Sequence, residues 1–274
     1  MIDFFSFGMS SSLTAVQGLL MPALFFLLIG LAVKKAKLIT DVKKSAKESA
    51  LNVKIFLFDS FAMSPVIILV SLTVNSFFQW HGWTLVSQQT WSELPKELVI
   101  VIAVFAGDLI GYWRHRLEHT WILWPSHAVH HSDTQMTWFT LQRFHPVNRI
   151  TTTAIDSAFL LALGLPPFAV IANGFVRHYY GYFIHADLPW TYGWLGRIFV
   201  SPAMHRWHHA ADHRFFQTNF ATVFSVFDQV FGTHKVPGPC DSKLGVTDQI
   251  EASLIGQLGY MFRKKSYRRA RKPR

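Results

Sequence analysis

Three groups of histidines stand at spacings that bring side chains together on a helix. His115 and His119 form an HxxxH motif, and two HxxHH motifs follow at 127–131 and 205–209. Residues three or four apart share one helix face, with Cβ atoms about 5–6 Å apart. HxxxH therefore directs two imidazoles toward one point, and HxxHH directs up to three. Imidazole is the commonest side-chain ligand of first-row metal ions, so these motifs predict a metal site.

The number of donors indicates two metal ions rather than one. The three motifs supply eight imidazole nitrogens, which is more than the four that a tetrahedral zinc site uses. Two ions sharing about eight to ten donors account for the whole set.

The composition favours a lipid environment. Half of the 274 residues are hydrophobic and 15% are charged, with a net charge of +10, 25 Phe and 10 Trp. Clustered basic residues beside long apolar runs argue for lipid and against nucleic acid as the partner. The single cysteine, Cys240, excludes an internal disulfide and a cysteine-rich zinc or iron–sulfur site.

Apolar runs predict several membrane segments. Four runs could cross or enter a bilayer, at 17–33, 55–78, 98–113 and 150–184. Pro65 is expected to kink the second run. Gly164-Leu165-Pro166-Pro167 divides the last run into a helical hairpin that enters the membrane and returns.

Charge placement predicts the topology. A lysine-rich helix at 34–54 is expected on the cytoplasmic membrane surface, and the Trp-containing loop 79–97 on the other side. This topology puts the N-terminus outside, and the histidine motifs and the C-terminus inside. The basic tail 263–274 is expected to be disordered, with contact to anionic headgroups as the alternative.

The predicted fold class is an all-α integral-membrane helical bundle with a cytoplasmic helical cap that carries a histidine-rich di-metal site. The expected parts are N-terminal spans with the lysine-rich segment at 1–97, a catalytic domain at 98–237 and a C-terminal basic tail at 238–274. A bacterial inner membrane is the expected location.

The motifs and their surroundings resemble the fatty acid hydroxylase/sterol desaturase superfamily, whose signature is HxxxH, HxxHH and a distal HxxHH. Similarity to bacterial members and to alkylglycerol monooxygenase extends over about 95–237. The matching segments are GDLIGYWRHRLEH at 107–119, HAVHHSD at 127–133, RFHP at 143–146, IHAD at 184–187, SPAMHRWHHA at 201–210, Asn219-Phe220 and DQVFGT at 228–233.

The resemblance implies an O2-dependent non-haem di-iron enzyme that hydroxylates or desaturates a lipid or sterol drawn from the bilayer. The sequence has no GxGxxG or CxxCH motif, so electrons are expected from a separate reductase, ferredoxin, cytochrome or pterin. The implied iron ligands are His115, His119, His127, His130, His131, His205, His208 and His209.

Further residues are candidates for the same site. His185 corresponds to a histidine that often completes the family's set, whereas His178 precedes it by seven residues instead of the usual four or five. His145, beside Pro146, is a candidate ligand or a support for one. Asp108 and Asn219 are candidates for orienting a ligand. Weaker candidates are Glu118, Asp133 and Asp228, and the remaining histidines, His81, His213 and His234, are expected to be structural or solvated.

Other functions remain open at this point. His115–His119 also reads HxxEH, in which Glu118 would activate water in a zinc-dependent membrane hydrolase. A b-type cytochrome, a metal transporter and a catalytically inactive metal-binding membrane protein are the remaining alternatives.

Overall fold

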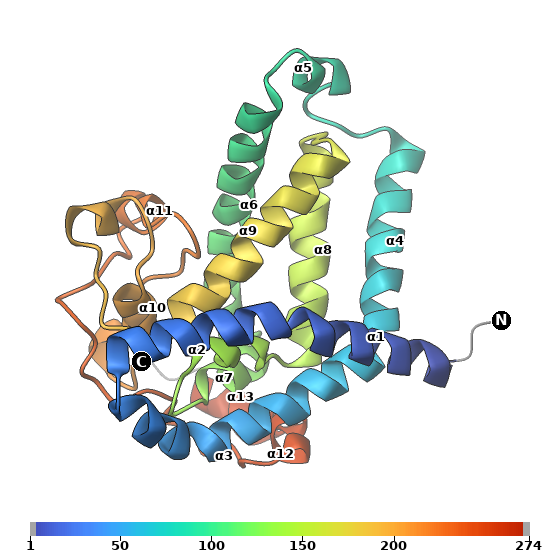
Figure 1. Cartoon of the computed structure of the whole chain (residues 1–274). Coiled ribbons are helices and arrows are strands. Elements are labelled where there is room, and N and C mark those ends of the chain that lie inside the picture. Colours follow the sequence, from blue (N-terminus) through green and yellow to red (C-terminus); the bar gives the residue numbers. More distant parts are fainter. Residues whose placement is uncertain (1–3, 271–274) are drawn as a thin grey trace.

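Four long helices form a bundle that carries the histidine-bearing segments at one end (Figure 1). They are α4 (Ser64–His81), α6 (Lys96–Glu118), α8 (Pro146–Ala162) and α9 (Pro167–His185). The computed structural model describes residues 4–270. The predicted hairpin is present: α8 and α9 are joined by a turn at 163–166 in which Gly164 has a φ of 65°.

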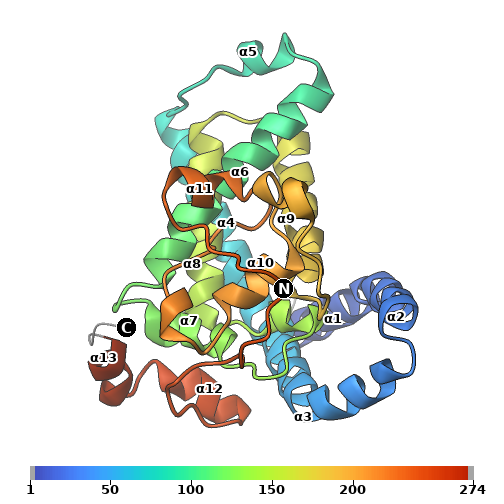
Figure 2. The same cartoon turned by 90° about the vertical axis from the view of Figure 1, so that its left-hand side faces the viewer.

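Short helices and loops form a cap at the histidine-bearing end, and both views show it there (Figures 1 and 2). Two of its pieces are α7 (Trp124–His131) and α10 (Pro202–His208). The others are η2 (Trp138–Gln142), η4 (His213–Phe215), α12 (Leu254–Tyr260) and α13 (Lys264–Ala270). α11 (Val226–Val230) lies beside α6, part-way along the bundle (Figures 1 and 2), and the Ser225 hydroxyl joins it to the Gly196 carbonyl of η3 (Gly193–Arg197) at 2.8 Å.

The all-helical prediction is confirmed. Within residues 4–270, extended pairing is limited to two isolated bridges, Phe199 with Phe224 and Ala210 with Leu244. Two continuous helices, Phe4–Lys34 and Lys37–His81, are long and apolar enough to cross a membrane by length and composition.

The first predicted span takes an unexpected direction. α1 (Phe4–Gly18) and α2 (Leu20–Lys34) form a nearly continuous helix that lies across the base of the bundle (Figures 1 and 2). Phe26 stacks on Trp138 of η2 with ring centroids 5.2 Å apart, which holds α2 against the cap. This direction differs from the predicted span at 17–33 with an outside N-terminus, because α1 begins at the same end as the histidines. Hydropathy identifies an apolar helix, but packing sets its direction.

The predicted lysine-rich helix and the predicted kink both occur. α3 (Lys37–Phe58) continues through a π-helical turn, η1 (Asp59–Met63), into α4, and the chain bends sharply there (Figure 1). Pro65 lacks a backbone N–H and its ring conflicts with the carbonyl four residues earlier, so the bend falls just before it.

The end of the bundle away from the cap carries α5 (Gln88–Ser92). Trp80 and Trp83 are largely exposed there, as expected of interfacial tryptophans. Trp91 differs: it is buried, and its Nε1–H donates to the Leu163 carbonyl at 3.0 Å. Its role is therefore to join α5 to the α8–α9 turn.

Two glycines of α6 allow α9 to pack closely against it. A Cβ at Gly107 would lie 2.1 Å from Asn173 Oδ1, and one at Gly111 would lie 1.9 Å from Arg177 Nη2. Without side chains at these positions, both polar residues of α9 reach across α6. Arg177 thereby approaches Asp156 of α8 at 2.9 Å.

The C-terminal segment is folded onto the cap instead of extending as a solvated tail. Tyr260 of α12 is buried against Trp124 and Ala128 of α7. Lys264–Ala270 form α13, so the predicted disorder does not hold for this part of 263–274, and residues 271–274 lie outside the described residues.

Candidate metal centre

The structure brings nine predicted histidines together where the bundle meets the cap. His115 lies on the last turn of α6 with His119 at its C-cap, and α7, α9 and α10 supply the rest. The five-histidine group is His115, His119, His127, His131 and His208, and the four-histidine group is His130, His185, His205 and His209. Within each group the donor nitrogens all lie within 4.8 Å of one another.

The HxxHH motifs divide their histidines between the two groups. In α7, His127 and His131 belong to the five-histidine group, whereas His130 belongs to the other. The second motif is reversed, since only its middle histidine, His208, joins the five-histidine group. The expectation that one HxxHH aims up to three imidazoles at a single point is therefore wrong. In α7 the helix brings His127 and His131, four residues apart, into the same group. It directs His130, three residues after His127, toward the neighbouring group.

The spacing of the Nε2 atoms suits a bound metal ion. In the five-histidine group, His115 Nε2 lies 3.0 Å from Nε2 of both His127 and His208. In the four-histidine group, His185 Nε2 lies 3.1 Å from His130 Nε2 and 3.0 Å from His205 Nε2. Two nitrogens bound at about 2.1 Å to one ion are about 3.0 Å apart when the angle is 90°. The residues present therefore fit first-row metal ions.

Backbone carbonyls orient several rings with Nε2 facing inward. Nδ1 of His115 lies 2.7 Å from the Phe220 carbonyl, and Nδ1 of His208 lies 2.7 Å from the Thr218 carbonyl. His185 uses the Gly181 carbonyl of its own helix, at 2.6 Å. An Nδ1–H that donates to a carbonyl leaves the Nε2 lone pair free to bind metal.

A strained turn supplies two of these carbonyls. Gln217 and Asn219 have φ values of 61° and 60°, so the residues that follow them point their carbonyls at different histidines. Asn219 tolerates this conformation, and its side-chain amide bonds the backbone of Lys235 through both Oδ1 and Nδ2, each at 2.8 Å. Asn219 therefore holds the turn whose carbonyls face the histidines.

Two buried carboxylates fix the segment after this turn. Asp108 accepts the backbone N–H groups of Val223 and Phe224 at 3.0 and 2.8 Å, as well as that of Thr222. Asp228 accepts the N–H groups of Phe220 and Ala221 at 2.7 and 2.9 Å. The predicted direct bond from Asp108 to an imidazole is absent, because its oxygens are used by the loop that presents the Phe220 carbonyl to His115.

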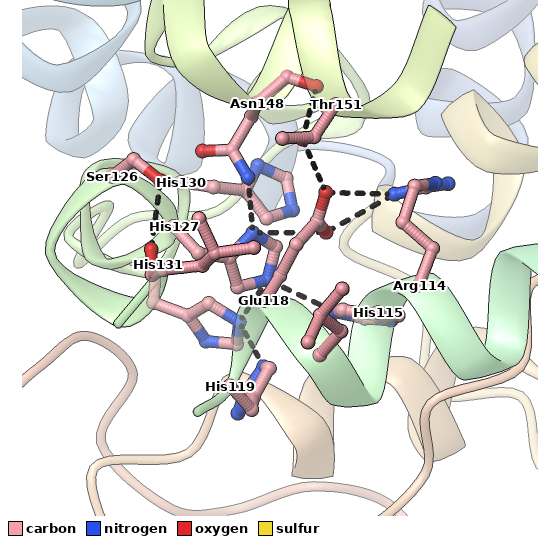
Figure 3. Close-up of polar contacts among 12 residues, drawn as sticks. Arg114, His115, Glu118, His119, Ser126, His127, His130, His131, Asn148 and Thr151 are labelled. Atoms are coloured by element: carbon pink, nitrogen blue, oxygen red, sulfur yellow. Dashed lines mark hydrogen bonds and ion pairs between the residues drawn. The ribbon is translucent and has the colours of Figure 1, made fainter. Parts of the chain in front are cut away.

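Glu118 lies behind the five-histidine group and not at its centre (Figure 3). Its carboxylate accepts two bonds from Arg114 Nη1, at 3.0 and 3.1 Å, and its Oε2 is 3.5 Å from His127 Nδ1. Arg114 also pairs with Asp156 at 2.8 Å. Glu118 is thus a neutralised support for His127, and this position disfavours a role in activating water on a zinc ion.

Two further candidate histidines, His145 and His178, lie outside both groups. His145 caps α8: its Nδ1 accepts the Val147 N–H at 3.2 Å and its Nε2 donates to the Leu258 carbonyl at 3.0 Å. Both nitrogens are engaged, so His145 is not placed to bind metal. His178 faces the bundle interior, where its ring packs edge-on against Tyr182 with centroids 4.6 Å apart.

The ion pairs around Arg114 were not anticipated from the sequence. The i, i+4 spacing of Arg114 and Glu118 is a readable signal for their pairing. No sequence pattern connects either residue with Asp156 or Arg177, which come from α8 and α9. Asp133, another candidate, ties the loop after α7 to α3 by accepting Asn52 Nδ2 at 2.9 Å.

The cap histidines are held uncharged. Burial, followed by the neighbouring imidazoles, lowers the pKa of His127, His130 and His131 well below 6.5. Burial also lowers the pKa of His208 to about 4. Neutral imidazoles are the form that binds metal, so no proton need be displaced near neutral pH.

These pKa shifts predict acid destabilisation of the metal-free protein. Below pH 6.5 the unfolded chain binds more protons than the folded chain, so the histidines' contribution is complete above about pH 6.5 and is lost as the pH falls toward about 4. Thermal unfolding in detergent should show a melting temperature that declines over this range. His208→Gln should flatten the decline, while replacement of the exposed His213 should not. A melting temperature that rises on acidification would contradict the prediction.

Two cavities reach the histidines from different sides. A cavity of about 1040 Å³ lies between α1, α4, α6, α8 and α9 and ends at both groups, including His115 and His130. A second cavity of about 20 Å³ touches His119, His131 and His208 from the cap side, with room for about one water molecule. The large cavity is the only one of the two that could admit a lipid chain.

The fold and site define a class: a helical protein with two candidate membrane helices and paired histidine groups suited to metal ions. Residues 100–233 match the sequence profile of the fatty acid hydroxylase family. The predicted resemblance to the fatty acid hydroxylase/sterol desaturase superfamily is thereby confirmed for this segment.

Similar proteins include several that act on lipids or sterols. An ornithine lipid hydroxylase of Rhizobium tropici is 30% identical over 173 residues, which are 62% of this chain and 52% of that protein. An alkylglycerol monooxygenase of Danio rerio is 31% identical over 48% of this chain and 29% of its own length. A Delta(7)-sterol 5(6)-desaturase of Gibberella zeae is 28% identical over 66% of this chain and 55% of its own length.

The chain therefore spans about half the length of the ornithine lipid hydroxylase and less than a third of the length of the alkylglycerol monooxygenase. No solved structure matches it.

Proposed function

We propose that this protein is a membrane-bound non-haem di-iron oxygenase that hydroxylates or desaturates a C–H bond of a lipid. The observation that carries the proposal is the pair of histidine groups at the inner end of a cavity between apolar helices. The relatives that hydroxylate or desaturate lipids and sterols support the same reaction class.

The nine grouped histidines would hold two iron ions, with His115, His119, His127, His131 and His208 on one and His130, His185, His205 and His209 on the other. Bound iron would supply the activation of O2 to an oxidant that removes hydrogen from an unactivated C–H bond. The protein's own task is to orient the imidazoles, and the carbonyls of Thr218 and Phe220 do this for His208 and His115.

The proposed substrate enters from the bilayer. The large cavity is lined by α4, α8 and α9, and the outer faces of α4 and α9 carry exposed apolar side chains such as Leu69 and Ile171. A lipid chain could therefore pass between these helices from the bilayer to the cavity. Electrons would come from a separate reductase, ferredoxin, cytochrome or pterin. The cap, the lysine-rich α3 and the C-terminus would face the cytoplasm, in a bacterial inner membrane.

The test is lipid analysis of cells with and without the gene under oxygen-18. A lipid that gains one labelled oxygen only when the gene is present is expected for a hydroxylase, and a loss of two hydrogens for a desaturase. Purified protein should bind about two iron ions per chain after anaerobic reconstitution. A single zinc ion with no affinity for iron, together with an unchanged lipid profile, would refute the proposal.

Glu118→Gln separates the oxygenase from a zinc hydrolase. Because Glu118 supports His127 from behind, its loss should slow lipid oxidation by about 10–100-fold without abolishing it. In a hydrolase the same change would remove the base and with it all activity. The measurement is the rate of lipid oxidation by iron-loaded protein, beside amide and ester hydrolysis by zinc-loaded protein. Hydrolysis by the wild type that Glu118→Gln eliminates would favour the hydrolase.

A further inference from the structure

A second polar assembly lies in the cavity wall, apart from the histidine groups. Arg149 of α8 donates from Nε to Asp59 Oδ2 at 3.1 Å and from Nη2 to Gln142 Oε1 at 2.9 Å. Gln142 in turn donates to the Tyr182 hydroxyl, and the His178 ring packs on Tyr182. All five residues line the cavity. We call Asp59, Gln142, Arg149, His178 and Tyr182 the polar network.

The polar network has hydrogen-bonding capacity that the protein does not use. Asp59 Oδ1 is buried and accepts no hydrogen bond. The Arg149 side chain remains 31% exposed. Within residues 4–270 the ring nitrogens of His178 have no hydrogen-bond partner, although His178 lines the cavity. A ligand in the cavity would therefore meet Arg149, which can donate hydrogen bonds, and His178, whose two ring nitrogens can donate one and accept one.

The location of the polar network makes a purely structural role costly. Asp59 lies in a helix that is long and apolar enough to cross a membrane, where ionisable side chains are expensive and usually mark a substrate path. Arg149 and His178 face the same cavity from the first turn of α8 and from α9. Asp59 also opens the π-helical turn η1, a feature that is common at functional sites. A lipid chain alone would need none of these groups.

The polar network lies close to the four-histidine group. The Phe144 ring stacks on His130 with centroids 4.6 Å apart and an interplanar angle of 11°. The Arg149 guanidinium lies 5.1 Å from the centroid of the Phe144 ring. Because each is about 5 Å from that ring, the guanidinium and the His130 ring are at most about 10 Å apart.

The cavity side of α1 is polar in the same way. Ser10, Ser11 and Thr14 line the cavity, whereas Phe4 and Leu13 of the same helix are exposed. The hydroxyl-bearing face of α1 is thus turned toward the cavity and its apolar face outward. This arrangement is the one expected if part of the cavity's content is polar.

We propose that the polar network binds a polar group of the substrate that both donates and accepts hydrogen bonds and carries no net charge, such as an amide, a hydroxyl or a zwitterionic aminoacyl group. The Arg149–Asp59 pair is itself neutral, which favours such a group over a net anion or cation. The substrate is then an amphiphile that is oxidised near its polar group and not at the far end of its chain, because Arg149 lies close to the four-histidine group. This inference rests on the proposed function, since it concerns the same cavity.

The experiment compares two lipids with the same chain. N-palmitoylethanolamine carries an amide and a hydroxyl, whereas methyl palmitate can only accept hydrogen bonds. Binding of each to the full-length protein in nanodiscs is measured by native mass spectrometry, without turnover. The wild type should bind N-palmitoylethanolamine at least about tenfold more tightly, which corresponds to one or two extra hydrogen bonds. Asp59→Asn combined with Arg149→Gln should remove most of this preference while keeping a neutral pair.

Two further variants keep the result interpretable. His178→Phe leaves the Arg149–Asp59 pair intact and should reduce the preference by itself, which covers the case in which the double variant does not fold. Ser71→Ala, in the same cavity but outside the polar network, should leave the preference unchanged. Equal binding of both lipids by the wild type, or a preference that survives both network variants, would overturn the proposal. Because binding is measured without turnover, failure of the oxygenase assignment would appear separately, in the oxygen-18 experiment.

Discussion

His130→Ala should lower the bound iron from about two ions per chain to about one or fewer and reduce lipid oxidation by more than about 100-fold. His130 is the one histidine of α7 in the four-histidine group, and its Nε2 lies 3.1 Å from that of His185. Its loss leaves three imidazoles in that group and removes the ring that stacks on Phe144. Iron should be measured by elemental analysis after anaerobic reconstitution, with oxidation assayed on the same samples.

The matched control is His213→Ala, which removes a largely exposed histidine outside both groups. Its iron content and activity should equal those of the wild type. His208→Ala should also lower the bound iron and the lipid oxidation, in this case through the five-histidine group, to which His208 belongs. Retention of about two ions by His130→Ala would show that the two groups are not separate metal pockets.

Arg114→Met should destabilise the folded protein by about 3–5 kcal/mol, because it leaves the buried Glu118 carboxylate without its cation. Arg114 contacts Glu118 at 3.0 Å and Asp156 at 2.8 Å, and its side chain is 11% exposed. Glu118 has no other arginine within ion-pair distance among residues 4–270, while Asp156 retains Arg177 at 2.9 Å. Most of the expected effect therefore arises at Glu118. Equilibrium unfolding in mixed detergent micelles measures it.

The double variant Arg114→Met with Glu118→Gln is the control for this effect. It removes the stranded carboxylate together with its partner, so it should recover a substantial part of the lost stability. A double variant that is less stable than Arg114→Met would mean that Glu118 contributes through contacts other than this pair. The contact that would account for this result is the one with His127, whose Nδ1 lies 3.5 Å from Glu118 Oε2.

Local sequence patterns predicted the helices of the bundle and the clustering of the histidines. Apolar runs located α4, α6 and the α8–α9 hairpin, since a run of that length with Pro166-Pro167 at its centre can form little else. The histidine spacings indicated a shared site because the helix repeat fixes which side chains share a face. His185 lies in the four-histidine group. It was a candidate because of the family resemblance, and its own spacing did not indicate it.

Features that depend on tertiary packing could not be predicted in this way. The direction of α1 and α2 depends on contacts such as Phe26 with Trp138, which join residues more than a hundred positions apart. Asp108 and Asn219 were expected beside an imidazole, yet they act through the backbone of the 217–224 segment. Hydrogen bonds to a distant backbone leave no periodic trace in a sequence. The same limit applies to His145, a candidate ligand or support. Its partner is the Leu258 carbonyl, which belongs to a segment expected to be a tail.

The crossed arrangement of the HxxHH motifs has a thermodynamic consequence. α7 and α10 each carry histidines of both groups, so neither short helix can be ordered for one group alone. Whichever ion arrives first would restrict the motion of both helices and so meet the entropy cost of ordering the second pocket in advance. Loading of the two pockets would then be cooperative, with the half-filled protein a minor species.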